Sequence, residues 1–175
     1  MRILGLTVFS LLLCSSVLAQ KAEMMTIKLY FHKEKLNPGM EDCNKVFPVT
    51  RRIPKTTAVA TATLQELLKG TTKEEEAKKF SSFSPEETAG IFKSVSVKNR
   101  AAYVNFTKRV YLQMGNATTS CGGGFFAMVE ETLYQFPTIK KVYYAIEGNS
   151  NDFYDWVQVG DCPYSKKHCA SSNFK

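Results

Sequence analysis

The sequence predicts an α+β domain with a mostly antiparallel or mixed sheet of four to five strands and two to three helices packed on one face. Short segments with alternating apolar residues come in pairs, and amphipathic segments lie between those pairs. Alternation with a period of two is typical of half-buried strands, whereas helices show apolar residues three and four apart. A length of 175 residues and a hydrophobic content of 44% suit a single domain with its own core. The expected order is β-β-α-(α)-β-β-α-β.

Five segments are predicted as strands because their apolar residues alternate. They are residues 26–31, 46–53, 92–97, 102–106 and 141–147. Pro48 cannot donate a ladder hydrogen bond, so it marks a sheet edge or the start of its strand. The third and fourth strands should form a hairpin that turns at Lys98-Asn99-Arg100, where Asn99 tolerates a positive φ better than Arg100 does.

Three segments are predicted as helices. Residues 58–69 carry a leucine stripe, and Gly70 is well placed to end that helix. Thr72 and Glu75 have the spacing of a capping box, which predicts a short polar helix over residues 72–79. Residues 125–136 show the strongest helical pattern, which Pro137 stops. Residues 81–87 are expected to form a turn.

The N-terminus has the pattern of a secretory signal. Arg2 precedes an apolar stretch over residues 3–13, and small residues follow up to Ala19, which predicts cleavage between Ala19 and Gln20. The stretch is shorter than the roughly 20 residues that span a bilayer. Cys14 raises the alternative of a lipid anchor, but Leu13 precedes it where a lipidation signal has a small residue. The expected product is extracytoplasmic, either secreted or periplasmic, after removal of residues 1–19.

The formal charge of +7 falls to +6 when Arg2 leaves with the signal. A basic balance is compatible with nucleic acid, anionic lipid or anionic wall polymer. An exported location disfavours nucleic acid, and the lysines are scattered along the chain. An ordinary solvated surface therefore explains most of the charge.

Four cysteines remain after signal removal, and an even number in an exported chain indicates disulfides with three possible connectivities. Cys162 and Cys169 flank a short loop and are expected to pair, which leaves Cys43 with Cys121. Zinc is the alternative because His168 adjoins Cys169, but the spacing fits no common zinc motif. We expect neither a metal nor a cofactor.

No set of catalytic residues stands out. Neither histidine belongs to a nucleophile motif, and a disulfide-bonded Cys121 could not act as a nucleophile. Glu130 and Glu131 diverge by about 100° around a helix, so they are interpreted as a solvated face. The glycines at 122–124 offer either an anion-binding nest or, as we expect, a connection that lets the next helix pack closely against the sheet.

Two separated blocks of the sequence go beyond generic patterns. The first comprises VFPVTRRIP at 46–54 and TAVATATLQELLKGTTKEE at 57–75, and the second is ETLYQFPTIKKV at 131–142, followed by Gly148. In this order and spacing they resemble the GerMN domain of sporulation and spore germination proteins. The resemblance assigns residues 26–148 to one GerMN-like domain. It implies a bacterial origin, a mixed sheet with helices on one side, and an interaction role in the envelope without catalytic residues. GerM proteins carry two such domains, whereas this chain shows one.

Residues 149–175 lie beyond the resemblance and form an aromatic, disulfide-stapled tail. Its residues Phe153, Tyr154 and Trp156 are the candidate interface, because aromatic side chains supply much contact area. The competing interpretation is that the tail belongs to the core, with Trp156 covering the open side of the sheet. The leading hypothesis is a non-enzymatic envelope protein that binds a protein partner. The alternative is a protein that binds peptidoglycan or, less favoured, hydrolyses it, with these aromatic residues beside Asp152 and Asp155.

Overall fold

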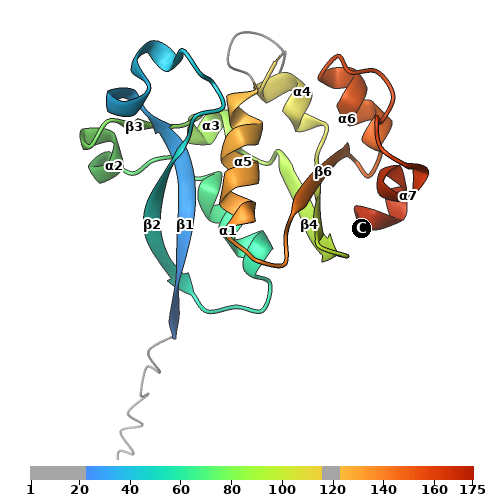
Figure 1. The fold of residues 1–175 in the computed structure, drawn as a ribbon, viewed down its shortest axis with the longest axis horizontal. Helices are drawn as coiled ribbons and strands as arrows, with labels where there is room; N and C mark the ends of the chain where they lie inside the picture. The colour runs from blue at the N-terminus through green and yellow to red at the C-terminus, as the bar shows by residue number, and fades with distance from the viewer. Residues whose placement is uncertain (1–22, 116–122) are drawn as a thin grey trace, which may run out of the picture.

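The computed structural model describes residues 23–115 and 123–175. The domain is α+β, as expected, and its described strands form two sheets of three strands each. Figure 1 shows the long helix α5 (Gly124–Tyr134) between the two sheets. The predicted signal at 1–19 lies outside the described residues.

The first sheet has the order β2-β1-β3. Strands β1 (Met24–Lys33) and β2 (Phe47–Pro54) pair antiparallel, and the short β3 (Phe80–Ser81) pairs with the end of β1. The predicted alternation of β1 is confirmed, because Ile27, Leu29 and Phe31 are all buried.

The second sheet has the order β4-β5-β6, formed by β4 (Phe92–Lys98), β5 (Ala101–Phe106) and β6 (Lys141–Ile146). The predicted hairpin is confirmed: β4 and β5 pair antiparallel, and both turn residues, Asn99 and Arg100, have positive φ. β6 runs parallel to β5, which is possible because the intervening chain crosses back before β6 begins.

Seven α-helices are present among the described residues. They are α1 (Val59–Leu67), α2 (Lys73–Ala77), α3 (Pro85–Thr88), α4 (Arg109–Gln113), α5, α6 (Ser150–Trp156) and α7 (Lys166–Cys169). The capping box of α2 is formed by Thr72 and Glu75, as the sequence predicts. The expected turn at 81–87 instead enters α3, which a second capping box between Ser84 and Glu87 stabilises.

The described strands form two sheets rather than the one larger sheet expected. Helix α5 and its C-cap residue Gln135 lie along the edge of β1 that faces away from β2. Thr132 accepts a hydrogen bond from the backbone N–H of Tyr30, and Gln135 bonds to the backbone of Lys28. These side chains satisfy polar backbone groups that would otherwise bond to water or to another strand. Alternation along a strand does not show which element covers its edge.

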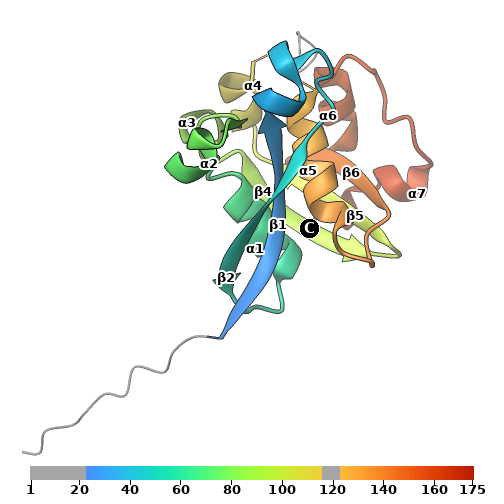
Figure 2. The ribbon, with the colours of Figure 1, turned by 60° about the vertical axis from the view of Figure 1, so that its left-hand side comes forward.

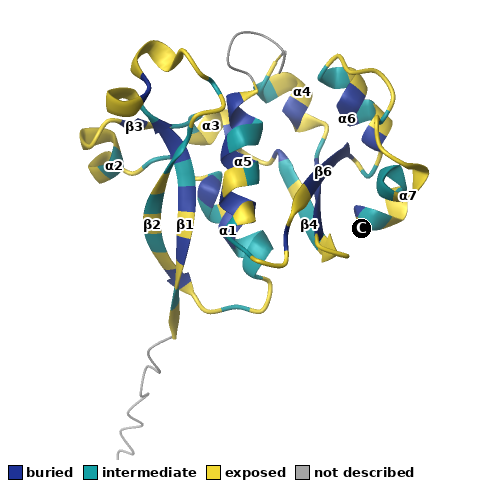
Figure 3. Ribbon diagram, in the orientation of Figure 1, coloured by how far each residue is buried: buried dark blue, intermediate teal, exposed yellow. Residues whose placement is uncertain are grey.

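One core fills the space between the sheets and contains apolar residues from β1, α1, α5, β5, β6 and α6. A smaller cluster lies on the other face of the second sheet, where Tyr103 and Tyr143 contact Phe174. Both faces of β5 are therefore buried, and β6 is buried along most of its length (Figure 3).

The residues after 148 pack against the sheets and belong to the same folded unit. The expected boundary at residue 148 therefore does not divide the hydrophobic core. Helix α6 places Phe153 against Tyr144 on the side of the main core, with ring centroids 4.8 Å apart. The last residues cover the opposite face, where Phe174 is 2% exposed. In Figure 2 this C-terminal part, coloured red, lies beside β5 and β6.

Candidate functional site

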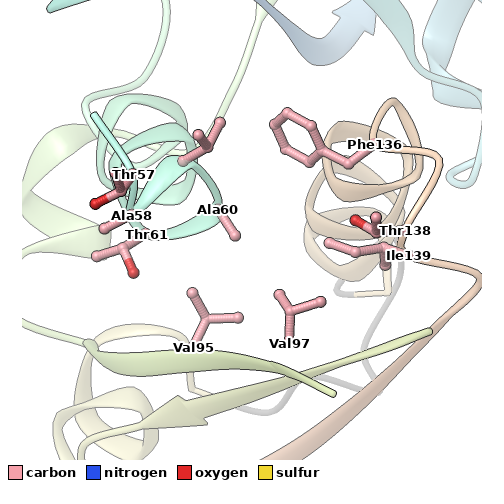
Figure 4. Close-up of a pocket in the computed structure, with 10 residues that line it drawn as sticks. Thr57, Ala58, Ala60, Thr61, Val95, Val97, Phe136, Thr138 and Ile139 are labelled. Atoms are coloured by element: carbon pink, nitrogen blue, oxygen red, sulfur yellow. The ribbon is translucent and has the colours of Figure 1, made fainter. Parts of the chain in front are cut away.

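An apolar groove lies between the start of α1, strand β4 and the segment that follows α5. It has a volume of about 370 Å³. Figure 4 shows Val95 and Val97 rising from β4 between Ala60 on one side and Phe136 on the other. The lining contains no ionisable side chain; it consists of Thr57, Ala58, Val59, Ala60, Thr61, Val95, Val97, Phe136, Thr138 and Ile139.

This groove borders an edge of the second sheet, because β4 pairs only with β5 among the described strands. Val97 is 41% exposed there. The sequence reasoning missed this surface because Val97 belongs to an alternating strand pattern, which indicates burial. Its exposure depends on how closely the start of α1 and the residues after α5 approach β4. Local periodicity contains no information about that distance.

Two of the three aromatic tail residues expected to form an interface, Phe153 and Tyr154, are buried inside the fold, which corrects that part of the prediction. Phe153 is 2% exposed and Tyr154 is 6% exposed, so neither offers a surface to a partner. Trp156 is half-buried: its ring packs edge-to-face on Phe126, and its indole N–H donates to the carbonyl oxygen of Gly115 at 2.9 Å. The tail packs on the sheet because aromatic side chains bury more apolar surface inside the fold than they would at its periphery.

Cys162 and Cys169 form the predicted disulfide, which closes the loop before α7. Cys43 is disulfide-bonded. Cys121 lies outside the described residues, so the pairing of Cys43 with Cys121 stays a prediction.

The two adjacent glutamates of α5 differ in their surroundings, which corrects the interpretation of both as a solvated face. Glu131 is exposed, whereas Glu130 is half-buried and accepts a hydrogen bond from the hydroxyl of Tyr144 at 3.0 Å. Burial raises the pKa of Glu130; the hydrogen bond from Tyr144 opposes this shift and the charge of Glu131 adds to it. Helical spacing could not reveal this difference, because it depends on which helix face meets β6.

Gly124 lets α5 pack against β1, as expected for the glycine run. A Cβ atom there would lie 2.8 Å from the carbonyl oxygen of Cys43 and 2.8 Å from Nε2 of His32. His32 is buried, and burial lowers its pKa, although a backbone hydrogen bond with Lys45 opposes this shift. These contacts assign His32 a packing position at the N-terminal end of α5.

Among residues 23–115 and 123–175, no three His, Cys, Asp or Glu side chains come together as metal ligands. In the same part of the chain no helix combines the length and apolar character that crossing a membrane requires.

The fold is a small α+β domain of two three-stranded sheets around one long helix. The sequence profile of Germane, described as sporulation and spore germination, matches residues 28–152. The chain belongs to this family, and the resemblance to GerMN domains is confirmed. No curated protein matches the sequence.

Solved structures similar to this chain include GerMN domains of the sporulation protein GerM from Bacillus subtilis. The first GerMN domain is 20% identical with a TM-score of 0.49, covering 81% of this chain and 94% of that one. The tandem GerMN domains are 18% identical with a TM-score of 0.48, covering 82% of this chain. This chain matches 45% of the tandem protein's length. A lipoprotein described as putative, from Clostridium perfringens, is 17% identical with a TM-score of 0.41, covering 71% of this chain and 75% of that one.

Proposed function

We propose that this protein is a non-enzymatic interaction module of the bacterial cell envelope, and that it binds a protein partner through the groove between α1 and β4. The family's link to sporulation and germination proteins supports a role in those processes. The signal pattern at 1–19 supports an extracytoplasmic location.

One observation carries the proposal: the groove exposes apolar side chains and contains no ionisable residue. Exposed apolar surface that is framed by polar residues is typical of protein contact sites, and Phe136 supplies the kind of aromatic side chain that often dominates such contacts. Acid–base or nucleophilic chemistry would need a titratable group in the groove, and its lining has none.

The experiment places a photo-crosslinking amino acid at Thr138 in the protein in its native envelope. A crosslinked protein that disappears when Val97 is changed to Glu supports the proposal, because a charge on the groove floor opposes apolar contact. Thr50→Glu, at an exposed position on β2, is the matched control and should leave the crosslink intact. The same crosslink in both variants would contradict the proposal, as would binding to purified peptidoglycan that replaces the protein contact.

A further inference from the structure

A second cavity, which shares no lining residue with the groove, lies where α5, β6, α6 and the tail meet. Its volume is about 320 Å³, at the small end of the range for ligand pockets. Half of the residues in its lining are aromatic. The rings come from Phe126, Tyr144, Phe153, Tyr154 and Tyr164.

Glu130 is the one residue of this lining that is charged at neutral pH. Its carboxylate accepts a hydrogen bond from Tyr144 at 3.0 Å. None of the ion pairs within residues 23–115 and 123–175 includes Glu130. A partly desolvated carboxylate without a cationic partner is unfavourable unless a cation arrives from outside.

We propose that this cavity binds a small organic ammonium ion, with Glu130 as its counter-ion and the surrounding aromatic rings as its walls. The faces of aromatic rings carry partial negative charge, so they attract a cation in addition to the attraction from the carboxylate of Glu130. Apolar walls suit an alkylated ammonium group better than a strongly hydrated metal ion. An anion would be repelled by Glu130, and a neutral ligand would leave the carboxylate unpaired.

The site is connected to pH through Glu130. The titratable groups that interact with it are Glu131 and Tyr134 on α5, Tyr144 on β6 and Tyr154 on α6, while Tyr164 of the tail acts on Tyr134 and Tyr154. Burial raises the pKa of Glu130 above the ordinary value of 4.5. Protonation removes the counter-ion, so ammonium binding should weaken as the pH falls, beginning above 4.5.

The experiment titrates the protein with choline and with cadaverine and follows binding by calorimetry and NMR. Choline tests a quaternary ammonium group and cadaverine a primary one. The neutral isostere 3,3-dimethylbutan-1-ol has the shape of choline without its charge. We expect saturable binding of at least one cation, no measurable binding of the alcohol, and about a tenfold loss of affinity in Glu130→Gln.

Glu131→Gln is the matched control, because it removes the neighbouring exposed charge and should leave the affinity nearly unchanged. Circular dichroism melting checks that each variant is folded. Equal binding of choline and the alcohol, unchanged affinity in Glu130→Gln, or no saturable binding of either cation would overturn the proposal. If Glu130→Gln does not fold, comparing choline with its neutral isostere still tests whether the cavity recognises the positive charge, because this comparison needs no variant.

Discussion

The side chain of Gln135 bonds twice to the backbone of Lys28, accepting from its N–H at 2.9 Å and donating to its carbonyl oxygen at 2.7 Å. A neighbouring β-strand would make the same pair of bonds. Helix α5 thus completes this part of the β1 edge with side chains, whereas β3 pairs with the end of the strand at His32 and Lys33.

We predict that Gln135→Ala destabilises the fold by about 1 kcal/mol, because two backbone groups of Lys28 lose their protein partners and must bond to water. The amide hydrogen of Lys28 should also exchange faster with solvent. Denaturant unfolding and hydrogen exchange measure the two effects. Gln65→Ala, at an exposed position on α1, is the control, and equal behaviour of both variants would show that the bonds to Lys28 do not stabilise the edge.

Truncation after Gly148 should unfold the domain or lower its melting temperature by more than ten degrees. It removes the Phe153 side chain from the main core and Phe174 from the other face of the second sheet. The carbonyl oxygen of Phe174 also accepts a hydrogen bond from the buried Asn105 side chain at 2.8 Å. Calorimetry on the truncated chain tests this, and a melting temperature within a few degrees of the full chain would show that the tail is dispensable.

A single substitution distinguishes the loss of one packed side chain from the loss of the whole tail. Phe174→Ala should cost about 3–5 kcal/mol, as expected for removal of a buried aromatic side chain. Val159→Ala, in the same tail but 57% exposed, should change stability by less than about 0.5 kcal/mol.

Arg51 joins β2 to α1 and α2, and we predict that Arg51→Ala costs roughly 3 kcal/mol. Its side chain is 10% exposed and bonds to both carboxylate oxygens of Glu75, at 3.0 and 2.5 Å, and to Glu66 at 3.1 Å. The control variant is Arg52→Ala, because the neighbouring Arg52 is exposed. Its free energy of unfolding, measured with denaturant, should lie within about 0.5 kcal/mol of that of the unchanged protein.

The same network predicts a loss of stability in acid. Burial alone would raise the pKa of Glu75, but hydrogen bonds and the charge of Arg51 outweigh it, so this pKa lies below the ordinary 4.5. A lowered folded-state pKa gives stability that is present above 4.5 and lost as the pH falls through the folded value. Arg51→Ala should flatten this part of the stability curve; an unchanged slope below pH 4.5 would argue against the ion pair.

Gly124→Ala should destabilise by about 1–3 kcal/mol, although alanine normally favours a helix over glycine. The added methyl group would meet His32 and the carbonyl oxygen of Cys43, both 2.8 Å away. At Gly123 nothing would lie within 4 Å of an added Cβ atom, so Gly123→Ala should be neutral or stabilising. Thermal melts that rank the two variants equally would refute the close approach of α5.

Glu130→Gln should stabilise the unliganded protein at pH 7. Because burial raises the folded-state pKa of Glu130, the folded state binds its proton more tightly than the unfolded state does. The unchanged protein therefore loses stability as the pH rises from the ordinary 4.5 through the folded value, whereas the glutamine variant does not. Melting temperatures from pH 4 to 8 should diverge with rising pH, and parallel curves would contradict the raised pKa.

The sequence by itself determined the features that depend on neighbouring residues. Alternation located β1, β2, β4, β5 and β6, and the spacing of Thr72 and Glu75 fixed the start of α2. Helices, strands and helix caps depend on backbone geometry and on hydrogen bonds between residues close in the sequence. Periodicity and capping residues therefore predict them directly.

Only the tertiary structure decided which of these elements share an edge, a face or a cavity. Gln135 and Lys28 are 107 residues apart, and no local pattern connects them. The aromatic tail has the composition of an interface, yet Phe153 and Tyr154 are buried because two open faces of a sheet were available to cover. Val97 follows a buried pattern and is exposed, while Glu130 follows a solvated pattern and is half-buried. Burial depends on what the rest of the chain places against a residue, and that is settled only when distant segments pack together.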